Sequence, residues 1–150
     1  MPLCVINAMP LSVVEDIRDR CLCFATQRAA RRLARRFDKA FLPIGLTNQQ
    51  FSLMTALSAP LPWRIGDLAE FLAMDRTSLT ANLKALERRG FAEIAPGAQD
   101  KRIHRPILTD AGRAALAAAE PIWRAEHVGV EAGLAQSDIG ALRAGLAALA

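Results

Sequence analysis

The chain has 150 residues, about the length of one domain and enough to bury a hydrophobic core. A hydrophobic fraction of 52% excludes an intrinsically disordered chain and suggests that a partner covers some apolar surface. The formal net charge is +4, and basic residues are concentrated in 18–39 and 76–105, whereas the part after Arg105 is net acidic. Segregated positive charge is typical of a protein that binds a polyanion, although solvated basic faces are also common.

The cysteines and the N-terminus indicate the compartment. Cys4, Cys21 and Cys23 are an odd number, lack the spacing of a zinc site and have no histidine nearby. We therefore expect no disulfide framework, no bound metal or cofactor, and a reducing cytoplasm. The N-terminus lacks the basic leader of a signal peptide, and no apolar run approaches the roughly 20 residues that span a bilayer. A soluble cytoplasmic protein without a membrane partner is predicted.

Hydrophobic periodicity predicts helices along the first half of the chain. One helix is expected to begin near Ser12 and to continue until Pro43 and Gly45 end it. Residues 47–50 have the pattern of a capping box, which opens a second helix that ends before Pro60.

The next two predicted helices form a helix-turn-helix unit. Apolar residues at helical spacing predict a third helix over 65–72. Asp75 is a favourable N-cap for a fourth helix, and Gly90 is placed to end it. The buried side of this fourth helix is expected to carry Leu79, Leu83 and Leu86. Only a few residues separate the two helices, which is the connection length of a helix-turn-helix motif.

The period changes to two after Gly90, which predicts a β-hairpin with strands at 91–94 and 103–107 around a turn-rich basic segment. Pro106 indicates that the second strand is an edge strand.

Two more helices are predicted at the C-terminus. Thr109 and Asp110 open a helix that runs toward Leu134, in which Pro121 is expected to cause a kink or a division. Ser137 and Asp138 cap the last helix. The predicted fold class is mainly α with a small β-hairpin wing, that is, a winged helix-turn-helix with flanking N- and C-terminal helices.

The exposed face of the fourth predicted helix has the composition of a helix that reads DNA. Opposite its leucines it carries hydroxyl and amide side chains together with long cations, which reach base edges and phosphates in a major groove. An ordinary polar face is the alternative, although such a face more often carries Glu and Lys. The predicted base-reading residues are Thr77, Ser78, Thr80 and Asn82, and the predicted phosphate contacts are Arg76 and Lys84.

The basic tip of the hairpin favours the DNA-binding interpretation over a solvated turn. Lys101 and Arg102 stand at the tip, and Arg102 is predicted to enter a minor groove, where negative potential is enhanced. Asp100 is expected to orient a neighbouring arginine through a charge-assisted hydrogen bond. Arg105 is a further predicted DNA contact, and His104 is expected to contact phosphate or solvent rather than a metal ion.

These segments resemble the MarR family of winged helix-turn-helix regulators. The resemblance runs from about Cys21 to Ala148 and rests on the stretches GLTNQQFSLMTAL, RIGDLAEFLAMDRTSLTANLKALERRGFAEI, DKR and LTDAGRAAL. It implies a homodimer on a palindromic operator in double-stranded DNA, which represses a neighbouring gene until a small ligand or an oxidant releases it. Residues 1–45 and 110–150 would then dimerise, and residues 46–109 would bind DNA. The alanine-rich C-terminal helices independently favour a dimer.

The LCFA stretch resembles the N-terminal helix of the organic hydroperoxide-sensing branch of the same family, with Cys23 at the position of the reactive cysteine. That branch places tyrosines near the sulfur, whereas this chain has none and carries Gln27 and Phe37 at the corresponding positions. The hydrogen bonds that would stabilise a thiolate are therefore expected to be missing. On one continuous helix Cys21 and Cys23 would point about 200° apart, so they would not hold one metal ion together. Inert thiols in a dimer interface are the alternative.

The effector is the least determined part of the prediction. The arginines of 28–36 could line a pocket for a small anionic or aromatic ligand or contact flanking phosphates, but hydration is expected for most of them. Trp63 and Trp123 are expected in the core, with the wall of a ligand cavity as the alternative, and His127 is expected to be packed or half-exposed.

No catalytic site is predicted. A thiol peroxidase would need a base near Cys23, and a protein-binding winged helix would need an apolar or acidic reading face.

Overall fold

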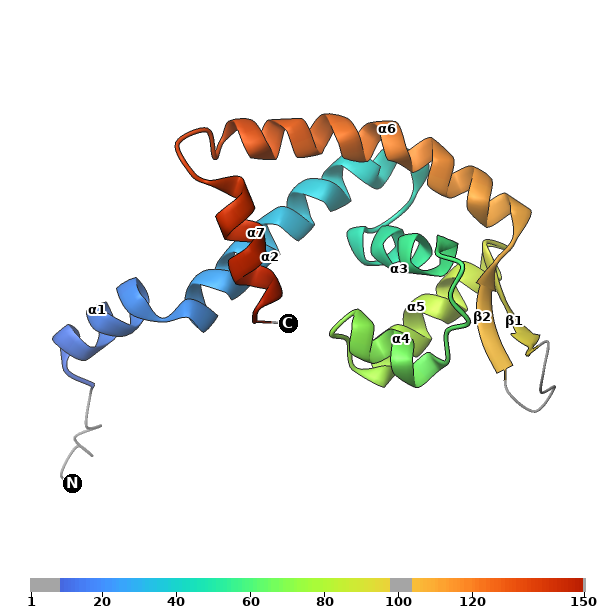
Figure 1. The fold of residues 1–150 in the computed structure, drawn as a ribbon, viewed down its shortest axis with the longest axis horizontal. Helices are drawn as coiled ribbons and strands as arrows, with labels where there is room; N and C mark the ends of the chain where they lie inside the picture. The colour runs from blue at the N-terminus through green and yellow to red at the C-terminus, as the bar shows by residue number, and fades with distance from the viewer. Residues whose placement is uncertain (1–8, 98–103, 150) are drawn as a thin grey trace, which may run out of the picture. The chain divides into compact units, whose positions relative to one another are not determined.

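The computed structural model describes residues 9–97 and 104–149, which are mostly helical with one two-stranded antiparallel sheet, as the sequence predicts. The chain divides into two compact units, one up to Arg36 and one from Phe37. No helix in the described ranges is long and apolar enough to cross a membrane. The elements are α1 (Leu11–Arg20), α2 (Leu22–Phe41), the short 3-10 helix η1 (Leu42–Ile44), α3 (Asn48–Ser58), α4 (Ile65–Phe71), α5 (Arg76–Arg88), β1 (Ala92–Pro96), β2 (His104–Leu108), α6 (Asp110–Ala132) and α7 (Ile139–Ala147) (Figure 1).

The first unit contains two helices where the sequence predicts one. The chain leaves helical geometry at Cys21, with φ −72° and ψ 109°, so the prediction of one continuous helix from near Ser12 to Pro43 is wrong. Cys21 acts as the N-cap of α2, because its carbonyl accepts the Ala25 N–H at 3.0 Å and its Sγ accepts the Phe24 N–H at 3.4 Å. A break of one residue leaves the apolar periodicity almost unchanged, which is why periodicity did not reveal it.

The predicted helix starts of the second unit are confirmed. Thr47 Oγ1 accepts the Gln50 N–H at 3.1 Å, and Gln50 Oε1 accepts the Thr47 N–H at 3.2 Å, which completes the capping box of α3. Thr109 and Asp138 cap α6 and α7 in the same manner, each accepting a backbone N–H. α6 continues through Pro121 without a division.

The core of the second unit lies among α3, α4, α5, the hairpin and the first half of α6 (Figure 1). The three predicted leucines of α5 are buried, and so are the apolar residues that they meet on the neighbouring helices. The largest fully buried side chains are Phe41, Leu53, Met54, Leu68, Leu79 and Leu86. The face of α5 opposite its leucines therefore points away from the core.

The β1–β2 hairpin is tied to the start of α6. Its register pairs Ala92 with Leu108, and Gly90 precedes it in the left-handed conformation, at φ 70°. Thr109 Oγ1 donates to the Gly90 carbonyl at 2.6 Å, while the Thr109 N–H donates to the Phe91 carbonyl at 3.1 Å. The predicted left-handed end of α5 at Gly90 is confirmed.

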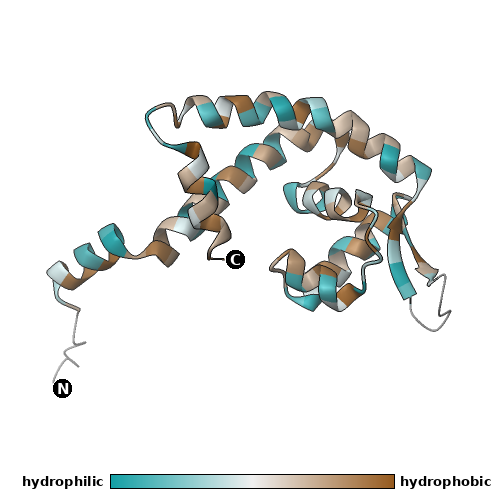
Figure 2. Cartoon of the chain, in the orientation of Figure 1, coloured by the Kyte–Doolittle hydropathy of each residue, from teal (hydrophilic) through white to brown (hydrophobic). Residues whose placement is uncertain are grey.

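Several apolar stripes are exposed in the part of the chain that the structure describes. Figure 2 shows hydrophobic residues recurring along α1, α2 and α7. On these helices the exposed large apolar side chains are Leu11, Val13, Val14, Ile17, Leu22, Phe24, Leu33, Leu142 and Leu146. Exposed apolar surface of this extent marks an interaction surface.

Gly112 permits the close packing of α6 against the hairpin. A Cβ at this position would lie 1.9 Å from the Phe91 carbonyl oxygen and 3.2 Å from Leu108 Cδ2. We expect Gly112→Ala to lower the free energy of unfolding by about 2–3 kcal/mol, because backbone must move to accommodate the methyl group. The matched control is Ala114→Gly at an exposed position of α6, which should cost about 1 kcal/mol or less through helix propensity alone. Urea denaturation measures both, and a Gly112→Ala variant as stable as the parent would contradict the packing.

Candidate nucleic-acid interface

α5 begins at a fully formed N-cap. Asp75 Oδ1 accepts the Ser78 N–H at 2.8 Å, and Asp75 Oδ2 accepts the Ser78 hydroxyl at 2.6 Å. The Ser78 hydroxyl, followed by the Ser78 N–H, lowers the pKa of Asp75 below its ordinary value, because both donors stabilise the carboxylate. The preceding turn passes through Ala73 at φ 49°. A short turn and a charged cap thus fix where α5 starts relative to α4.

The outward face of α5 is a single surface of hydroxyls, a methyl group and cations. A shallow hollow on this face is lined by Arg76, Thr77, Thr80, Ala81 and Lys84. The Thr80 hydroxyl donates to the Arg76 carbonyl at 2.7 Å, which leaves the hydroxyl oxygen able to accept another hydrogen bond. The guanidinium of Arg76 reaches back over α4, where its Nη2 lies 3.2 Å from the Cβ position of Gly66. Four of the predicted DNA-contacting residues therefore share one face.

Two other predicted base-reading residues lie at the edge of this face and bond within the chain. Ser78 is half-buried and caps the helix through Asp75. Asn82 is also half-buried, and its Nδ2 donates to the Ser78 carbonyl at 2.9 Å and to Gln49 Oε1 at 3.3 Å. The sequence analysis missed Gln49, since its contact with Asn82 joins two helices. It also missed Arg88, which is exposed and follows Lys84 by four residues on the same face.

Not every cation of the central segment is free for a partner. Arg89 Nη1 donates to the Gly45 carbonyl at 2.5 Å, and the Arg89 guanidinium lies over the Phe91 ring at 4.4 Å. Arg105 is half-buried, and its Nη1 donates to the Pro62 carbonyl. His104 is exposed at the start of β2.

The predicted tip residues Asp100, Lys101 and Arg102 lie outside the described residues. Their proposed roles at the wing therefore stay predictions.

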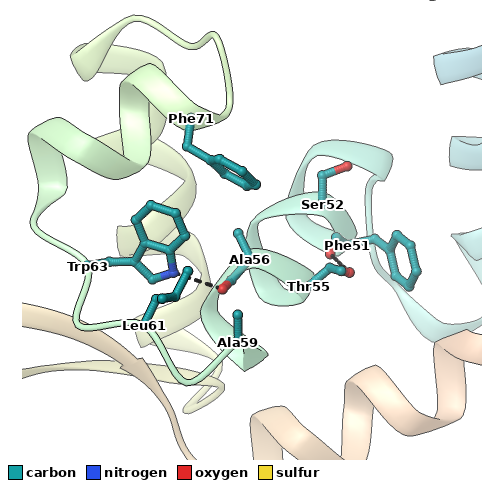
Figure 3. Close-up of a pocket in the computed structure, with 8 residues that line it drawn as sticks. All are labelled: Phe51, Ser52, Thr55, Ala56, Ala59, Leu61, Trp63 and Phe71. Atoms are coloured by element: carbon teal, nitrogen blue, oxygen red, sulfur yellow. Dashed lines mark hydrogen bonds between the residues drawn. The ribbon is translucent and has the colours of Figure 1, made fainter. Parts of the chain in front are cut away.

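A cavity of about 310 Å³ lies between α3 and α4, beside the loop that joins them (Figure 3). Its lining is almost entirely apolar, and of the described residues that form it none is charged. It consists of Phe51, Ser52, Thr55, Ala56, Ala59, Leu61, Trp63 and Phe71. The Trp63 indole N–H donates to the Ala56 carbonyl at 2.9 Å, and the Trp63 and Phe71 ring centroids are 4.9 Å apart. Trp63 thus lines a cavity, the alternative that the sequence left open, while also packing against the core.

Trp123 and His127 stack on α6 with ring centroids 5.0 Å apart. Both are half-buried, so His127 lies in one of the environments that the sequence predicts. Glu131 Oε1 lies 3.2 Å from His127 Nε2 and also accepts from Arg143 of α7 at 2.5 Å.

Cys23 has a hydrogen-bond donor that the sequence analysis did not foresee. Its Sγ accepts from Gln27 Nε2 at 3.2 Å, and Arg31 Nη2 donates to Gln27 Oε1 at 2.7 Å. Gln27 therefore supplies a hydrogen bond that the absence of tyrosine had led us to expect missing. Cys21 and Cys23 do not share one helix, because Cys21 lies outside the helix that contains Cys23. The angle of about 200° expected between their side chains on a continuous helix therefore does not apply. Among the described residues, no three potential metal-ligating side chains lie together.

The arrangement matches that of known regulators. A MarR family model matches residues 46–104. The *M. tuberculosis* transcriptional regulator MosR, solved in complex with DNA, is 39% identical, with 87% of this chain and 93% of that chain covered and a TM-score of 0.75. The chain belongs to the MarR family.

Two further proteins support the same assignment. The transcriptional repressor CouR, bound to a 23-mer DNA duplex, is 29% identical, with 95% of this chain and 99% of that chain covered and a TM-score of 0.77. The transcriptional activatory protein BadR of *Rhodopseudomonas palustris* is 33% identical over 95 residues, or 61% of this chain. That match spans only 54% of BadR, about half of its length. The family's fold is thus shown for nearly the whole chain, and α5 with the β1–β2 hairpin belongs to the winged helix-turn-helix part of that fold.

The cap of α5 predicts a pH dependence of stability. Because the pKa of Asp75 is lowered in the folded state, its stabilising effect is present above the ordinary carboxyl pKa and is lost as pH falls through the lowered value. In Asp75→Asn the cap keeps an acceptor oxygen but loses the charge. We therefore expect the parent to be more stable than Asp75→Asn at pH 6 and the gap to close toward pH 3, as measured by thermal unfolding. A gap that stays constant between these pH values would contradict the role of the carboxylate.

Proposed function

We propose that this chain is a homodimeric transcriptional regulator that binds a palindromic operator in double-stranded DNA and represses transcription from it. The observation that carries the proposal is the outward face of α5, where Thr77, Ala81 and Lys84 are exposed beside Arg76 and Thr80. MosR with DNA and CouR with a DNA duplex are relatives that support DNA as the partner. Repression follows the description of CouR, which matches this chain over a longer stretch than BadR does.

The residues divide into those that contact DNA and those that position them. Thr77 and Thr80 would reach base edges through their hydroxyls, and the Ala81 methyl would contact a thymine methyl. Arg76 and Lys84 would hold phosphates. Ser78 and Asn82 already donate hydrogen bonds within the chain, so they would orient the face, and they would donate to a base only by exchanging those bonds. At the wing, Arg102 and Lys101 would enter the minor groove, with Asp100 orienting the arginine.

A dimer would present two copies of α5 to successive major grooves. The exposed apolar side chains of α1, α2 and α7 support this, since such a surface is unusual on a monomer. We assign dimerisation to residues 1–45 and 110–150 and DNA binding to residues 46–109. A two-fold axis would then require half-sites about 34 Å apart, one turn of DNA.

The effector that we propose is a ligand with a flat aromatic group, bound in the cavity between α3 and α4. Trp63 and Phe71 offer aromatic faces there, and the uncharged lining favours an aromatic rather than an anionic group. A structure of CouR bound to p-coumaroyl-CoA, with 30% identity to this chain, supports an aromatic ligand for a related regulator.

The DNA-binding face is tested by removing one cation. Lys84→Ala should weaken binding about equally to all sequences and reduce the slope of log affinity against log salt by about 1, because one phosphate contact is lost. Fluorescence anisotropy with a duplex selected by the parent protein from a random library measures both quantities. Arg124→Ala is the matched control, since it also removes one exposed positive charge but on α6. An unchanged slope for Lys84→Ala, or equal slopes for both variants, would contradict the assignment.

A second candidate function is release from DNA by an oxidant that acts on Cys23. The supporting observation is the chain of hydrogen bonds in which Arg31 donates to Gln27 and Gln27 donates to the Cys23 sulfur. The Gln27 amide thus holds the Cys23 sulfur in one orientation, and cysteine sulfur is the group that peroxides oxidise. The Cys23 side chain is exposed in the chain, so an oxidant can reach it.

This second function predicts a difference between two glutamine substitutions. Gln27→Leu removes the hydrogen bond that orients the sulfur, and we expect alkylation of Cys23 by iodoacetamide to slow about two- to ten-fold, whereas Gln27→Asn keeps an amide donor and slows the reaction less. The measurement uses the variant with serine at Cys4 and Cys21, so that only one thiol reacts. Hydrogen peroxide should lower DNA affinity in this background and leave a Cys23→Ser protein unaffected. Equal peroxide sensitivity with and without Cys23 would exclude it as the sensor.

A further inference from the structure

We propose that Arg105 couples the cavity between α3 and α4 to the β1–β2 wing, so that an aromatic ligand in the cavity repositions the wing on DNA. The proposal rests on the DNA-binding function and the ligand cavity proposed above. It assigns Arg105 as a positioning residue, in place of the direct DNA contact that the sequence predicts.

The loop between α3 and α4 contacts both the cavity and strand β2 of the wing. Leu61 and Trp63 line the cavity, and the carbonyl of Pro62 between them accepts a hydrogen bond from Arg105 Nη1 on β2. The Trp63 N–H also donates to the Leu61 carbonyl at 2.9 Å, so these three residues form one tight turn. We therefore expect a displacement of the Trp63 ring to shift the Pro62 carbonyl through this turn.

The wall formed by Trp63 can move when a ligand enters. Besides its packing against the core, its indole is held by one hydrogen bond to the Ala56 carbonyl and by the ring of Phe71, which is itself 64% exposed. Figure 3 shows Trp63 and Phe71 on one side of the cavity and Ala56 and Thr55 of α3 on the other. A flat ring inserted between the two sides would compete with the contacts of Trp63 rather than with the rigid core.

Arg105, at the other end of the hydrogen bond to Pro62, lies at the base of the wing. Arg105 pairs with Ala95 in the sheet register, one residue from the start of β2. It directly precedes the buried Pro106, so its backbone is held while its side chain reaches the loop. The bond to Pro62 thus restrains the strand that leads out of the predicted tip, and its loss would free the wing to change its angle.

A positioning role for Arg105 and a direct DNA contact by Arg105 predict different salt dependences of DNA binding. If Arg105 held a phosphate, Arg105→Met would reduce the salt slope of DNA binding by about 1. As a positioning residue it makes no ionic contact with DNA, so Arg105→Met leaves the slope unchanged, weakens DNA binding as a filled cavity does, and removes the further effect of filling the cavity. Salt dependence therefore separates the two roles without knowledge of the natural ligand.

A double-mutant cycle tests the coupling without a ligand. Thr55→Trp places an indole in the cavity and mimics occupancy, and it is combined with Arg105→Met. DNA affinity is measured by anisotropy on a duplex that the parent protein selects from a random library. Ser58→Trp, on an exposed residue of α3 that does not line the cavity, is the matched control. Circular dichroism verifies folding, and Ser52→Phe replaces Thr55→Trp as the cavity-filling variant if the latter does not fold.

The expected result is that filling the cavity weakens DNA binding about five-fold or more with Arg105 present and less than about two-fold with Arg105→Met. Ser58→Trp should have no effect in either background, and the salt slope of Arg105→Met should equal that of the parent. An equal effect of the filled cavity in both backgrounds, no effect in the parent, or a slope reduced by about 1 overturns the coupling. Failure of the parent protein to select any duplex instead refutes the proposed DNA-binding function.

Discussion

Burial of the leucine line of α5 is the constraint on which the interface depends. Leu79, Leu83 and Leu86 are essentially inaccessible to solvent, and each contributes about 1.5–3 kcal/mol when fully buried. Because helical geometry fixes side chains three and four residues apart on one side, burying this line forces Thr77, Ala81 and Lys84 outward. The functional face is thus set by hydrophobic packing on the opposite side of the same helix.

The polar residues around that face differ in how much of their hydrogen-bonding capacity is already used. The Ser78 hydroxyl and the Asn82 amide N–H groups already donate within the chain, so donating to DNA instead would first require breaking a bond that contributes about 1 kcal/mol or more. Thr77 and Lys84 are exposed and carry no such cost. Residues of the first kind are suited to hold the geometry of the interface, and residues of the second kind are suited to contact the nucleic acid.

The parts of the structure that the sequence predicts are those encoded locally. The capping box at Thr47, the cap at Asp75 and the left-handed Gly90 each depend on a few neighbouring residues, so a short segment is sufficient to recognise them. The break at Cys21 is local too, but a thiol serves there as the capping acceptor, which residue preferences do not anticipate.

The features that the sequence does not reveal join segments distant along the chain. Arg105 and Pro62 are 43 residues apart, and Asn82 and Gln49 are 33 apart. Neither pair has a periodic signature, so no pattern in the sequence indicates either contact. Similarly, Trp63 was expected in the core because an aromatic residue between two helices usually packs there, and only the tertiary structure shows that one side of it borders a cavity.

The free energy of one hydrogen bond is sufficient for regulation. A hydrogen bond from a guanidinium to a carbonyl contributes about 1.5–3 kcal/mol, and allosteric coupling energies between sites fall in about the same range, 1–3 kcal/mol. The Arg105–Pro62 bond is therefore strong enough to carry a coupling that changes DNA affinity about 5- to 150-fold. Because Cys23 lies in the first unit and the cavity in the second, an oxidant and a ligand would act through different residues. A regulator built in this way needs no large domain movement within the winged helix, since one loop that touches both the ligand and the wing can transmit the signal.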